Sequence, residues 1–374
     1  MRVEFITGNI AIAEGAITAG LKLFAGYPIS PSSEILEHLS MELPKHGGIV
    51  VQTEDELAAI NVIVGASWAG LKAMTATSGP GLSLMAEGIG LAVMTEAPIV
   101  IVDVMRAGPS TGVATKVGQG DVMQARWLSH GPYELVVLAP WNAQECFDLM
   151  IKAFNISERL RIPVIVLTDA VIGHTREKVI VKEPHEVKII SRKRPKNPED
   201  YRKPFKVEND LVPPMTFLGE GYGILVESLT HDERGYYRPN TATHAMLVKR
   251  LVEKVRRHKN FIADSAVYFG DDVDILFIAF GSTARSVYDL VHDLRRKGIK
   301  ACLFRPKTLW PLDTSKLILL GRKARKVFVV ENNTGQLVYE VERILKTDNV
   351  ISIPLISLEA PSSNEIWEVV REWL

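Results

Sequence analysis

Short runs of β-branched residues alternate with helical segments over the first 180 residues, and this alternation is the strongest constraint on the fold. The runs at 99–103 (Ile-Val-Ile-Val-Asp) and 164–168 (Val-Ile-Val-Leu-Thr) are apolar almost throughout, which is typical of strands buried on both faces of a sheet. Parallel neighbours of this kind need a crossover, usually a helix, between them. The alternation therefore predicts a doubly wound, mainly parallel α/β domain.

The bounds of the expected elements follow from helix caps and polar turns. In the first domain we expect helices at 8–22, 32–43, 55–69, 82–95 and 143–159, and strand-like runs at 23–26, 49–52, 72–76, 99–103 and 164–168. A second α/β unit is expected from strands at 274–280, 300–304, 326–330 and 350–356, with helices between and after them. The chain is thus predicted to contain one domain at 1–185, a linker at 186–265 and a second domain at 266–374.

The predicted linker begins with a basic, proline-broken stretch at 188–209. A nucleic-acid patch is one interpretation of its positive charge. The acidic residues Glu199, Asp200 and Glu208 interrupt that charge, which favours a solvated crossover arm. We expect a helix at 241–258 to end the arm.

Composition excludes several classes of protein. The 374 residues carry a formal net charge of +0, which argues against chain-wide binding to nucleic acid or to an anionic membrane. The most apolar runs have strand length, and the N-terminus lacks a signal-peptide pattern, so we expect a soluble, cytoplasmic protein. Only Cys146 and Cys302 are present, which is too few for a four-cysteine cluster and gives no disulfide framework.

Four polar turns, rich in glycine and proline, follow predicted strands. They are 26–34 (Gly-Tyr-Pro-Ile-Ser-Pro-Ser-Ser-Glu), 52–57 (Gln-Thr-Glu-Asp-Glu-Leu), 77–81 (Thr-Ser-Gly-Pro-Gly) and 106–112 (Arg-Ala-Gly-Pro-Ser-Thr-Gly). Ligands of open α/β sheets bind at the carboxyl ends of the strands. The turns are therefore expected to form one side of a pocket.

Two simpler interpretations of these motifs fail. The stretch from Thr77, with Asp103 further along, superficially resembles a dinucleotide fingerprint, but Leu84 stands where the third glycine should be and Pro80 is atypical of the turn. The triplet His231-Asp232-Glu233 lacks the periodicity of metal ligands, because consecutive side chains point in different directions. We therefore predict no metal site in this chain.

Taken together, the motifs resemble the α subunit of 2-oxoacid:ferredoxin oxidoreductases, most closely those of the 2-oxoglutarate type. The motifs are Gly8-Asn9, the four turns, Gly-Ala-Ser-x-Ala-Gly at 65–70, Gln-Gly-Asp at 119–121, Thr-His-Asp-Glu at 230–233 and Glu-Asn-Asn-x-Gly-Gln at 331–336. The sequence departs from the family at Ser30, where threonine is usual, and at Ala107 and Ala114. The resemblance implies a thiamine-diphosphate-binding domain of the pyrimidine type and a transketolase C-terminal-like domain.

The resemblance also implies site residues. A thiamine enzyme needs a carboxylate beside the aminopyrimidine to promote the tautomer that removes the C2 proton, and the family places it at Glu56, with Glu54 as the alternative. Tyr27, Pro28, Ser78 and Gly79 are expected to contact the cofactor as well.

The substrate of such an enzyme is a 2-oxoacid, whose carboxylate and carbonyl must be held. Arg106 offers a planar donor fork and Ser30 a hydroxyl, and the family uses the matching residues for this task. A second carboxylate on the substrate would require a further cation, for which Lys116 is our first candidate, with Arg126 and His130 behind it.

Missing motifs imply partners. Thiamine sites mark their diphosphate–magnesium half with Gly-Asp-Gly, whereas Gly120-Asp121 is followed here by valine. The resemblance therefore implies a β subunit that carries Mg²⁺ and a [4Fe-4S] cluster, small ferredoxin-like γ and δ subunits, and ferredoxin and CoA as co-substrates. Two alternatives stay open: the same reaction on a branched-chain 2-oxoacid or an indolepyruvate, and a non-catalytic scaffold.

Overall fold

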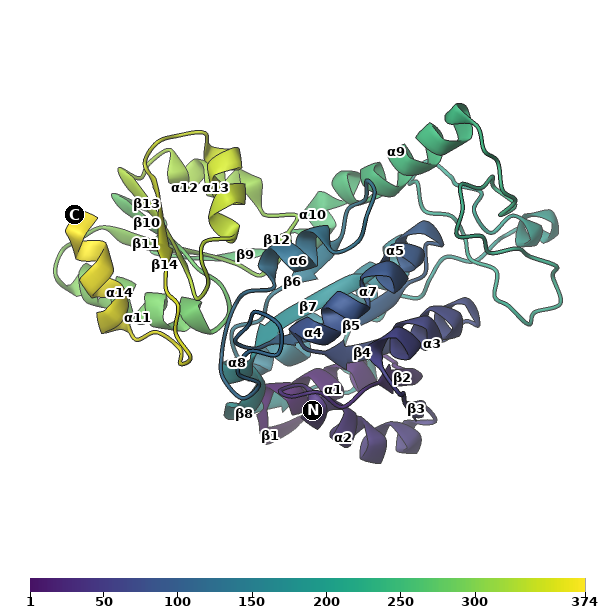
Figure 1. Ribbon diagram of the computed structural model, residues 1–374, viewed down its shortest axis with the longest axis horizontal. Coiled ribbons are helices and arrows are strands. Elements are labelled where there is room, and N and C mark those ends of the chain that lie inside the picture. Colours follow the sequence, from purple (N-terminus) through teal and green to yellow (C-terminus); the bar gives the residue numbers. More distant parts are fainter. Residues whose placement is uncertain (374) are drawn as a thin grey trace.

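Two large β-sheets organise the computed structural model, which describes residues 1–373 of the chain (Figure 1). The first has seven strands in the order β12-β6-β7-β5-β4-β2-β3, and every neighbouring pair is parallel except β12 with β6. Its strands are β2 (Leu23–Gly26), β3 (Ile49–Gln52), β4 (Ala73–Thr77), β5 (Ile99–Met105), β6 (Val136–Leu138), β7 (Val164–Asp169) and β12 (Thr308–Trp310).

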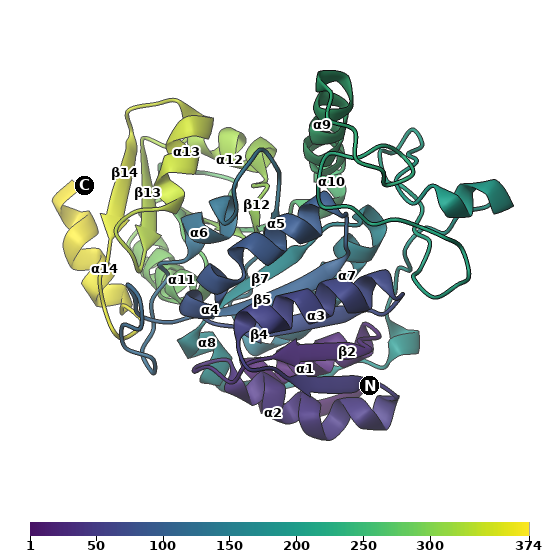
Figure 2. The ribbon, with the colours of Figure 1, turned by 45° about the vertical axis from the view of Figure 1, so that its right-hand side comes forward.

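Helices cover both faces of this sheet, and Figures 1 and 2 show α3, α4 and α5 together on one of them. That face carries α3 (Glu56–Trp68), α4 (Gly79–Leu84), α5 (Ala86–Met94) and α6 (Val122–Trp127), and the other carries α1 (Gly8–Thr18), α2 (Ser33–Glu42) and α7 (Ala143–Leu160). Side chains of β5 alternate between the two cores: Ile101 points into one and Val102 into the other. This double burial explains why β5 is apolar along almost its whole length.

Short elements complete the first domain. A two-stranded antiparallel sheet joins β1 (Arg2–Thr7) to β8 (Arg176–Val181), and the remaining pieces are η1 (Leu43–His46) and α8 (Ala170–His174). The expected helix at 82–95 is in fact two helices, α4 and α5, which meet at Met85. Ser32 precedes α2 without capping it, because its hydroxyl donates to the Ile29 carbonyl instead, at 2.9 Å.

The second large sheet is made by the C-terminal part of the chain, in the order β14-β13-β10-β11-β9. Its strands are β9 (Ser265–Tyr268), β10 (Ile275–Ile278), β11 (Ala301–Pro306), β13 (Lys326–Glu331) and β14 (Val350–Pro354), and its helices are α11 (Gly281–Arg296), α12 (Thr314–Gly321), α13 (Leu337–Leu345), α14 (Ser363–Val370) and η4 (Arg371–Trp373). Only β9 runs antiparallel to its neighbour. Between β11 and β13 the chain crosses to the first sheet as β12, so the two sheets share one continuous segment.

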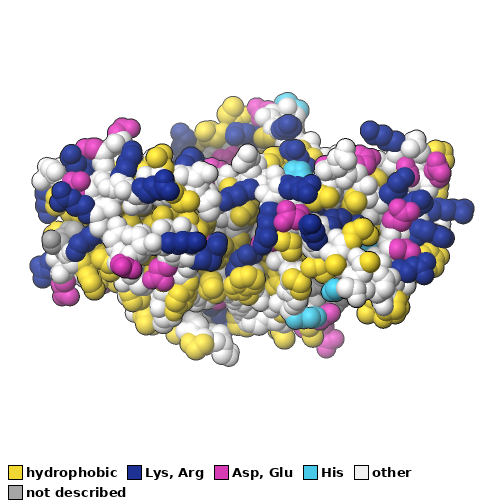
Figure 3. Space-filling model, turned by 90° about the horizontal axis from the view of Figure 1, so that it is seen from above, with side chains coloured by type: hydrophobic (Ala, Val, Ile, Leu, Met, Phe, Trp, Pro, Cys, Tyr) yellow, Lys and Arg dark blue, Asp and Glu magenta, His cyan; other side chains and the backbone are white. Residues whose placement is uncertain are grey.

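The arm lies at the opposite end of the molecule from the C-terminal domain (Figure 1). It follows η2 (Pro184–Glu186) and contains η3 (Pro198–Arg202), α9 (Thr241–Arg257) and α10 (Lys259–Ile262). Figure 3 shows Lys and Arg spread over one face of the molecule with Asp, Glu and hydrophobic side chains between them. The bounds 1–185, 186–265 and 266–374 stay predictions.

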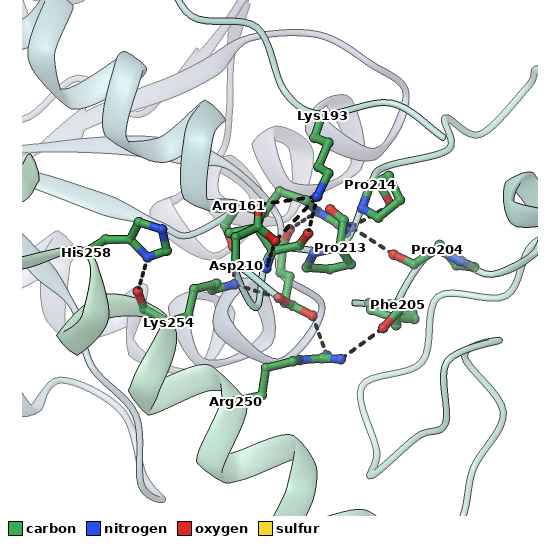
Figure 4. A network of polar contacts seen from close by, with 12 residues as sticks. Arg161, Lys193, Pro204, Phe205, Asp210, Pro213, Pro214, Arg250, Lys254 and His258 are labelled. Carbon is green, nitrogen blue, oxygen red and sulfur yellow. Dashed lines mark hydrogen bonds and ion pairs between the residues drawn. The ribbon is translucent and has the colours of Figure 1, made fainter. Parts of the chain in front are cut away.

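Buried charges fasten the arm to the first domain (Figure 4). Arg161 donates from Nη1 to the carbonyls of Pro204, Pro213 and Pro214, at 2.8, 3.2 and 3.2 Å. Glu96 accepts from Lys254, at 2.6 Å. Burial by itself would raise the pKa of Glu96, but Arg250, Lys254 and Arg161 outweigh it and lower that pKa to about 2. The otherwise irregular arm is thus held at a few buried polar points.

No helix in the described range 1–373 combines the length and hydropathy needed to cross a bilayer.

Candidate functional site

The four polar turns leave the first sheet at neighbouring positions. β3, β2, β4 and β5 are consecutive in the sheet and parallel, so their carboxyl ends lie along one edge. Gly26 pairs with Gln52, and Thr77 pairs with Asp103, which places the turns in register. The sheet topology therefore brings the four turns to one edge, as predicted from the sequence.

Glu56 is the first residue of α3, and its side chain is only 4% exposed. The preceding residue, Asp55, caps the helix by accepting from the Ala58 amide at 2.8 Å. The N-terminus of a helix favours an anion, so α3 stabilises the carboxylate of Glu56. Glu54 is exposed to solvent, which leaves Glu56 as the enclosed carboxylate of this turn.

The Glu56 carboxylate lies against the turn after β4. A Cβ on Gly81 would lie 2.4 Å from Oε1 of Glu56 and 2.0 Å from Oγ1 of Thr77, so only glycine fits there. Within residues 1–373, no side chain or amide donates a hydrogen bond to the Glu56 carboxylate. A buried carboxylate without an internal donor is a group that a ligand can satisfy.

Arg106 directly follows β5 and is 7% exposed. Its Nη1 donates to the backbone carbonyl of Ser30 at 2.8 Å, whereas its Nε is buried without a partner among the described residues. Ser30 itself is exposed, so its hydroxyl is free to face a ligand. The Arg106 guanidinium therefore reaches the main chain of Ser30 from a different turn.

A pocket of about 590 Å³ opens beside Arg106, between the first domain and the C-terminal domain. Arg106 and Gly79 line it from the first domain, and Asn332 and Ser357 line it from the second. Another cavity, of about 390 Å³, lies within the arm beside α9, and none of the predicted site residues lines it. The pocket beside Arg106 is the candidate site because two predicted site residues, Arg106 and Gly79, line it. Glu56, Ser30 and Lys116 are not among its lining residues.

Gln119 joins the two domains at the wall of this pocket. Its Oε1 accepts from the Thr283 hydroxyl at 2.9 Å and from the Asn332 amide at 3.2 Å, and its Nε2 donates to the Phe280 carbonyl at 3.1 Å. Its own carbonyl accepts from Asn333 at 2.7 Å. In the sequence, Gln119 is recognisable only as part of a motif. Nothing in the sequence indicates that it joins the two domains.

Asp121 lines the pocket, and the buried Asp103 lies close to it. Both carboxylate oxygens of Asp103 and one of Asp121 are buried without a partner in the described chain. Burial and the charge of Asp121 raise the pKa of Asp103, and burial raises the pKa of Asp121 to about 6. Asp121 lies close under the turn after β4, because a Cβ on Gly79 would be 3.0 Å from its Oδ2. Sequence reasoning missed this pair, since Asp103 looked only like the acid of a dinucleotide fingerprint.

The other predicted cofactor contacts differ in their exposure to solvent. Tyr27 is 40% exposed and Pro28 is exposed as well, on the turn that also carries Ser30. Ser78 is buried, its hydroxyl has no partner within residues 1–373, and Gly79 after it begins α4.

The candidate cations lie apart from one another. Lys116 forms an ion pair with Glu359, at the edge of the pocket, whereas Arg126 pairs with Glu134 at 2.6 Å and stacks on two tryptophans. His130 is exposed on another loop. Of the three, Lys116 is the one whose neighbour in sequence, Val117, lines the pocket.

The triplet at 231–233 has three separate sets of contacts. His231 stacks on Phe205 and bonds to the Leu229 carbonyl, Asp232 pairs with Arg238, and Glu233 pairs with Lys203. No group of three or more His, Cys, Asp or Glu side chains arranged to hold a metal ion occurs within the described chain.

Comparison with known families defines the class of protein. Residues 14–250 match the family model described as "Pyruvate flavodoxin/ferredoxin oxidoreductase, thiamine diP-bdg", and residues 273–358 match "Pyruvate:ferredoxin oxidoreductase core domain II". The chain belongs to this family of thiamine-diphosphate-dependent oxidoreductases. The predicted fold class, two mainly parallel α/β domains of which one is a thiamine-binding domain, is confirmed.

Within the family, the chain groups with α subunits of the 2-oxoglutarate type. It is 48% identical to 2-oxoglutarate synthase subunit KorA of Methanocaldococcus jannaschii, over 99% of this chain and 100% of that protein. Ketoisovalerate oxidoreductase subunit VorB of Methanothermobacter thermautotrophicus is 36% identical, over 90% of this chain and 88% of that one.

A solved structure agrees with these relatives. The 2-oxoglutarate:ferredoxin oxidoreductase from Magnetococcus marinus, described with 2-oxoglutarate, coenzyme A and succinyl-CoA bound, matches with a TM-score of 0.93 at 33% identity. The match covers 99% of this chain and 65% of that chain. The present chain thus spans about two thirds of the length of that structural relative.

Proposed function

We propose that this chain is the α subunit of a 2-oxoglutarate:ferredoxin oxidoreductase. The enzyme converts 2-oxoglutarate, CoA and oxidised ferredoxin to succinyl-CoA, CO₂ and reduced ferredoxin, or runs in reverse. The observation that carries the proposal is the enclosed Glu56 carboxylate at one edge of a sheet that also presents Arg106 to a pocket. The 48% identity to a KorA subunit supports the choice of substrate.

Glu56 is proposed to act on the aminopyrimidine of thiamine diphosphate. When bound, the cofactor supplies a carbon nucleophile and an electron sink for decarboxylation. Glu56 suits the task of holding and returning one proton at a ring nitrogen, because it is buried, lies at a helix N-terminus and lacks an internal donor. The proposed cofactor contacts are Ser78 and Gly79 on the turn after β4, and Tyr27 and Pro28 on the turn after the neighbouring strand β2.

Arg106 and Ser30 are proposed to hold the 2-oxoacid. The guanidinium keeps free N–H groups after its bond to the Ser30 carbonyl, and these match a carboxylate in geometry and charge. The Ser30 hydroxyl can donate to the same oxygens or to the substrate carbonyl. Lys116 is the proposed contact for a second carboxylate.

A β subunit is proposed to complete the site. Both cysteines of this chain are buried, and they lie in separate domains, so a cluster ligated by four thiolates needs another chain. We propose that this partner carries Mg²⁺, the cofactor diphosphate and a [4Fe-4S] cluster, with small γ and δ subunits and ferredoxin as further partners. We also propose a cytoplasmic location.

A substrate panel tests the proposal. The chain would be co-expressed with its β subunit, and the complex assayed with CoA, a viologen dye and either 2-oxoglutarate, 2-oxoisovalerate or indolepyruvate. We expect the highest kcat/KM with 2-oxoglutarate, and no activity from the α chain alone.

The 36% identity to a VorB subunit makes a branched-chain 2-oxoacid the second candidate substrate. A higher kcat/KM with 2-oxoisovalerate would move the assignment to that substrate. A complex without a cluster and without turnover on any 2-oxoacid would favour the scaffold alternative.

A further inference from the structure

An ion pair bridges the two domains at the edge of the pocket. Lys116 belongs to the loop after β5, and its partner Glu359 follows β14 in the C-terminal domain. Residues 356–358, just before Glu359, line the pocket, as does Val117. Lys116 and Glu359 do not line the pocket themselves, but each is next in sequence to a residue that does, Val117 on one side and Leu358 on the other.

The backbone holds Lys116 next to Arg106. The Ala107 amide donates to the Lys116 carbonyl at 2.9 Å, and the Val113 amide donates to the Ala107 carbonyl at 2.9 Å, which folds the loop back on itself. Gly118 closes this contact, because a Cβ there would lie 2.9 Å from the Arg106 carbonyl oxygen. The side chains of Arg106 and Lys116 thus extend from neighbouring backbone positions beside one pocket.

The ion pair itself is open to exchange. The Lys116 side chain is 40% exposed and that of Glu359 is 73% exposed. Such exposed pairs are weak, because water competes for both charges. By contrast, Arg106 is almost fully buried and is bonded to the main chain, so it is a fixed cation. Lys116 is the cation that can change partners.

We propose that Glu359 is an internal carboxylate that occupies Lys116 in the empty pocket and yields it to the second carboxylate of a dicarboxylic 2-oxoacid. This inference rests on the proposed function, since it assumes that Arg106 holds the first carboxylate. A 2-oxoacid with an uncharged side chain cannot replace Glu359 on Lys116. Glu359 thereby acts as a specificity-determining residue, although it does not contact the reacting atoms.

Removal of the internal competitor should favour the dicarboxylic substrate alone. In the purified complex, Glu359→Gln should lower KM for 2-oxoglutarate by about threefold to tenfold and leave KM for 2-oxobutyrate unchanged. Lys116→Gln should raise KM for 2-oxoglutarate by about tenfold or more, again with no change for 2-oxobutyrate. In the double variant, the effect of Glu359→Gln should disappear.

Glu368→Gln is the matched control, because Glu368 on α14 forms an exposed ion pair with Arg371, with side chains 56% and 55% exposed. It should leave both KM values unchanged. Equal changes for the two substrates, or an effect of Glu359→Gln that persists without Lys116, would overturn the inference while 2-oxoacid turnover still upheld the proposed function. A wild-type complex that turns over no 2-oxoacid would overturn both.

Discussion

The Arg106 guanidinium donates to the backbone carbonyl of Ser30 at 2.8 Å and so joins the turn after β5 to the turn after β2. These turns are separated by 76 positions in sequence, with β4 between their strands in the sheet. The bond orients the guanidinium while leaving donors free, and it fixes the main chain beside the Ser30 hydroxyl. The relation of these two residues therefore defines where a substrate carboxylate would lie.

Replacement of Arg106 should affect the substrate more than the cofactor. We expect Arg106→Ala to raise KM for 2-oxoglutarate by about tenfold to a hundredfold, because a charge-assisted hydrogen bond contributes about 1.5–3 kcal/mol. The Kd for thiamine diphosphate should change far less. Steady-state kinetics and calorimetry on the purified complex measure the two quantities. A larger loss in cofactor affinity than in substrate affinity would contradict the assigned role.

Glu56→Gln should abolish turnover and leave assembly intact. The amide keeps the size of the side chain but cannot take up a proton at neutral pH, so a fall in kcat of at least about 10²-fold is expected. Size-exclusion chromatography of the variant complex and a stopped viologen assay provide the measurement.

Glu54→Gln is the control for this experiment, because Glu54 is exposed on the same turn. It should leave kcat close to that of the wild type. Near-normal turnover of Glu56→Gln together with an inactive Glu54→Gln would transfer the proton-transfer role to Glu54.

The pair Asp103 and Asp121 should make stability depend on pH. The pKa of Asp121 is raised from 3.8 to about 6 and that of Asp103 is raised too, so the folded chain binds more protons than the unfolded chain in this interval. The contribution of the pair to stability is therefore greatest below pH 3.8 and is lost as the pH rises through about 6.

Asp103→Asn should remove much of this dependence, because the amide carries no charge beside Asp121. Thermal unfolding of the α chain at pH 5 and pH 7, values that lie roughly on either side of the raised pKa, would compare variant and wild type. We expect the difference in Tm, variant minus wild type, to be larger at the higher of the two pH values. If the difference in Tm between variant and wild type is the same at both pH values, the aspartate pair does not hold a proton in the folded chain.

The buried cluster that fastens the arm should dominate stability. Glu96→Ala leaves Lys254 buried without its carboxylate, which should cost about 3–5 kcal/mol. Acid should have a similar effect, because stability that depends on the lowered pKa of Glu96 is lost as the pH falls from 4.5 towards about 2. Denaturant unfolding measures the change.

Glu208→Ala is the matched control within the arm, since Glu208 pairs with Lys193 on the surface at 2.8 Å. It should change stability by less than about 1 kcal/mol. Equal effects of the two substitutions would show that the buried cluster does not hold the arm in place.

Much of the fold could be predicted because the parallel strands are buried on both faces. β5 and β7 are apolar enough to be found without any other information, and β3 was predicted at its observed bounds. The strands β6, β9 and β12 were missed, and so were β1 and β8, which pair with each other outside the two large sheets. The return of β12 to the first sheet depends on tertiary packing. No periodic pattern in the local sequence predicts it.

The candidate site was predictable only in part. Turn chemistry identified the stretches that hold Glu56 and Arg106, because glycine and proline mark strand ends. The roles of Gln119 and Asp121 depend on contacts with residues far along the chain, such as Thr283 and Asn332, and no spacing rule predicts those.

The central claim is that this chain supplies half of a thiamine site, which a β subunit completes. Titration calorimetry of thiamine diphosphate with Mg²⁺ against the α chain alone, the β chain alone and the purified complex tests it most directly. The account predicts tight stoichiometric binding by the complex, weak or undetectable binding by the α chain, and weaker binding by a complex that carries Glu56→Ala. Full-affinity binding by the α chain alone would contradict it.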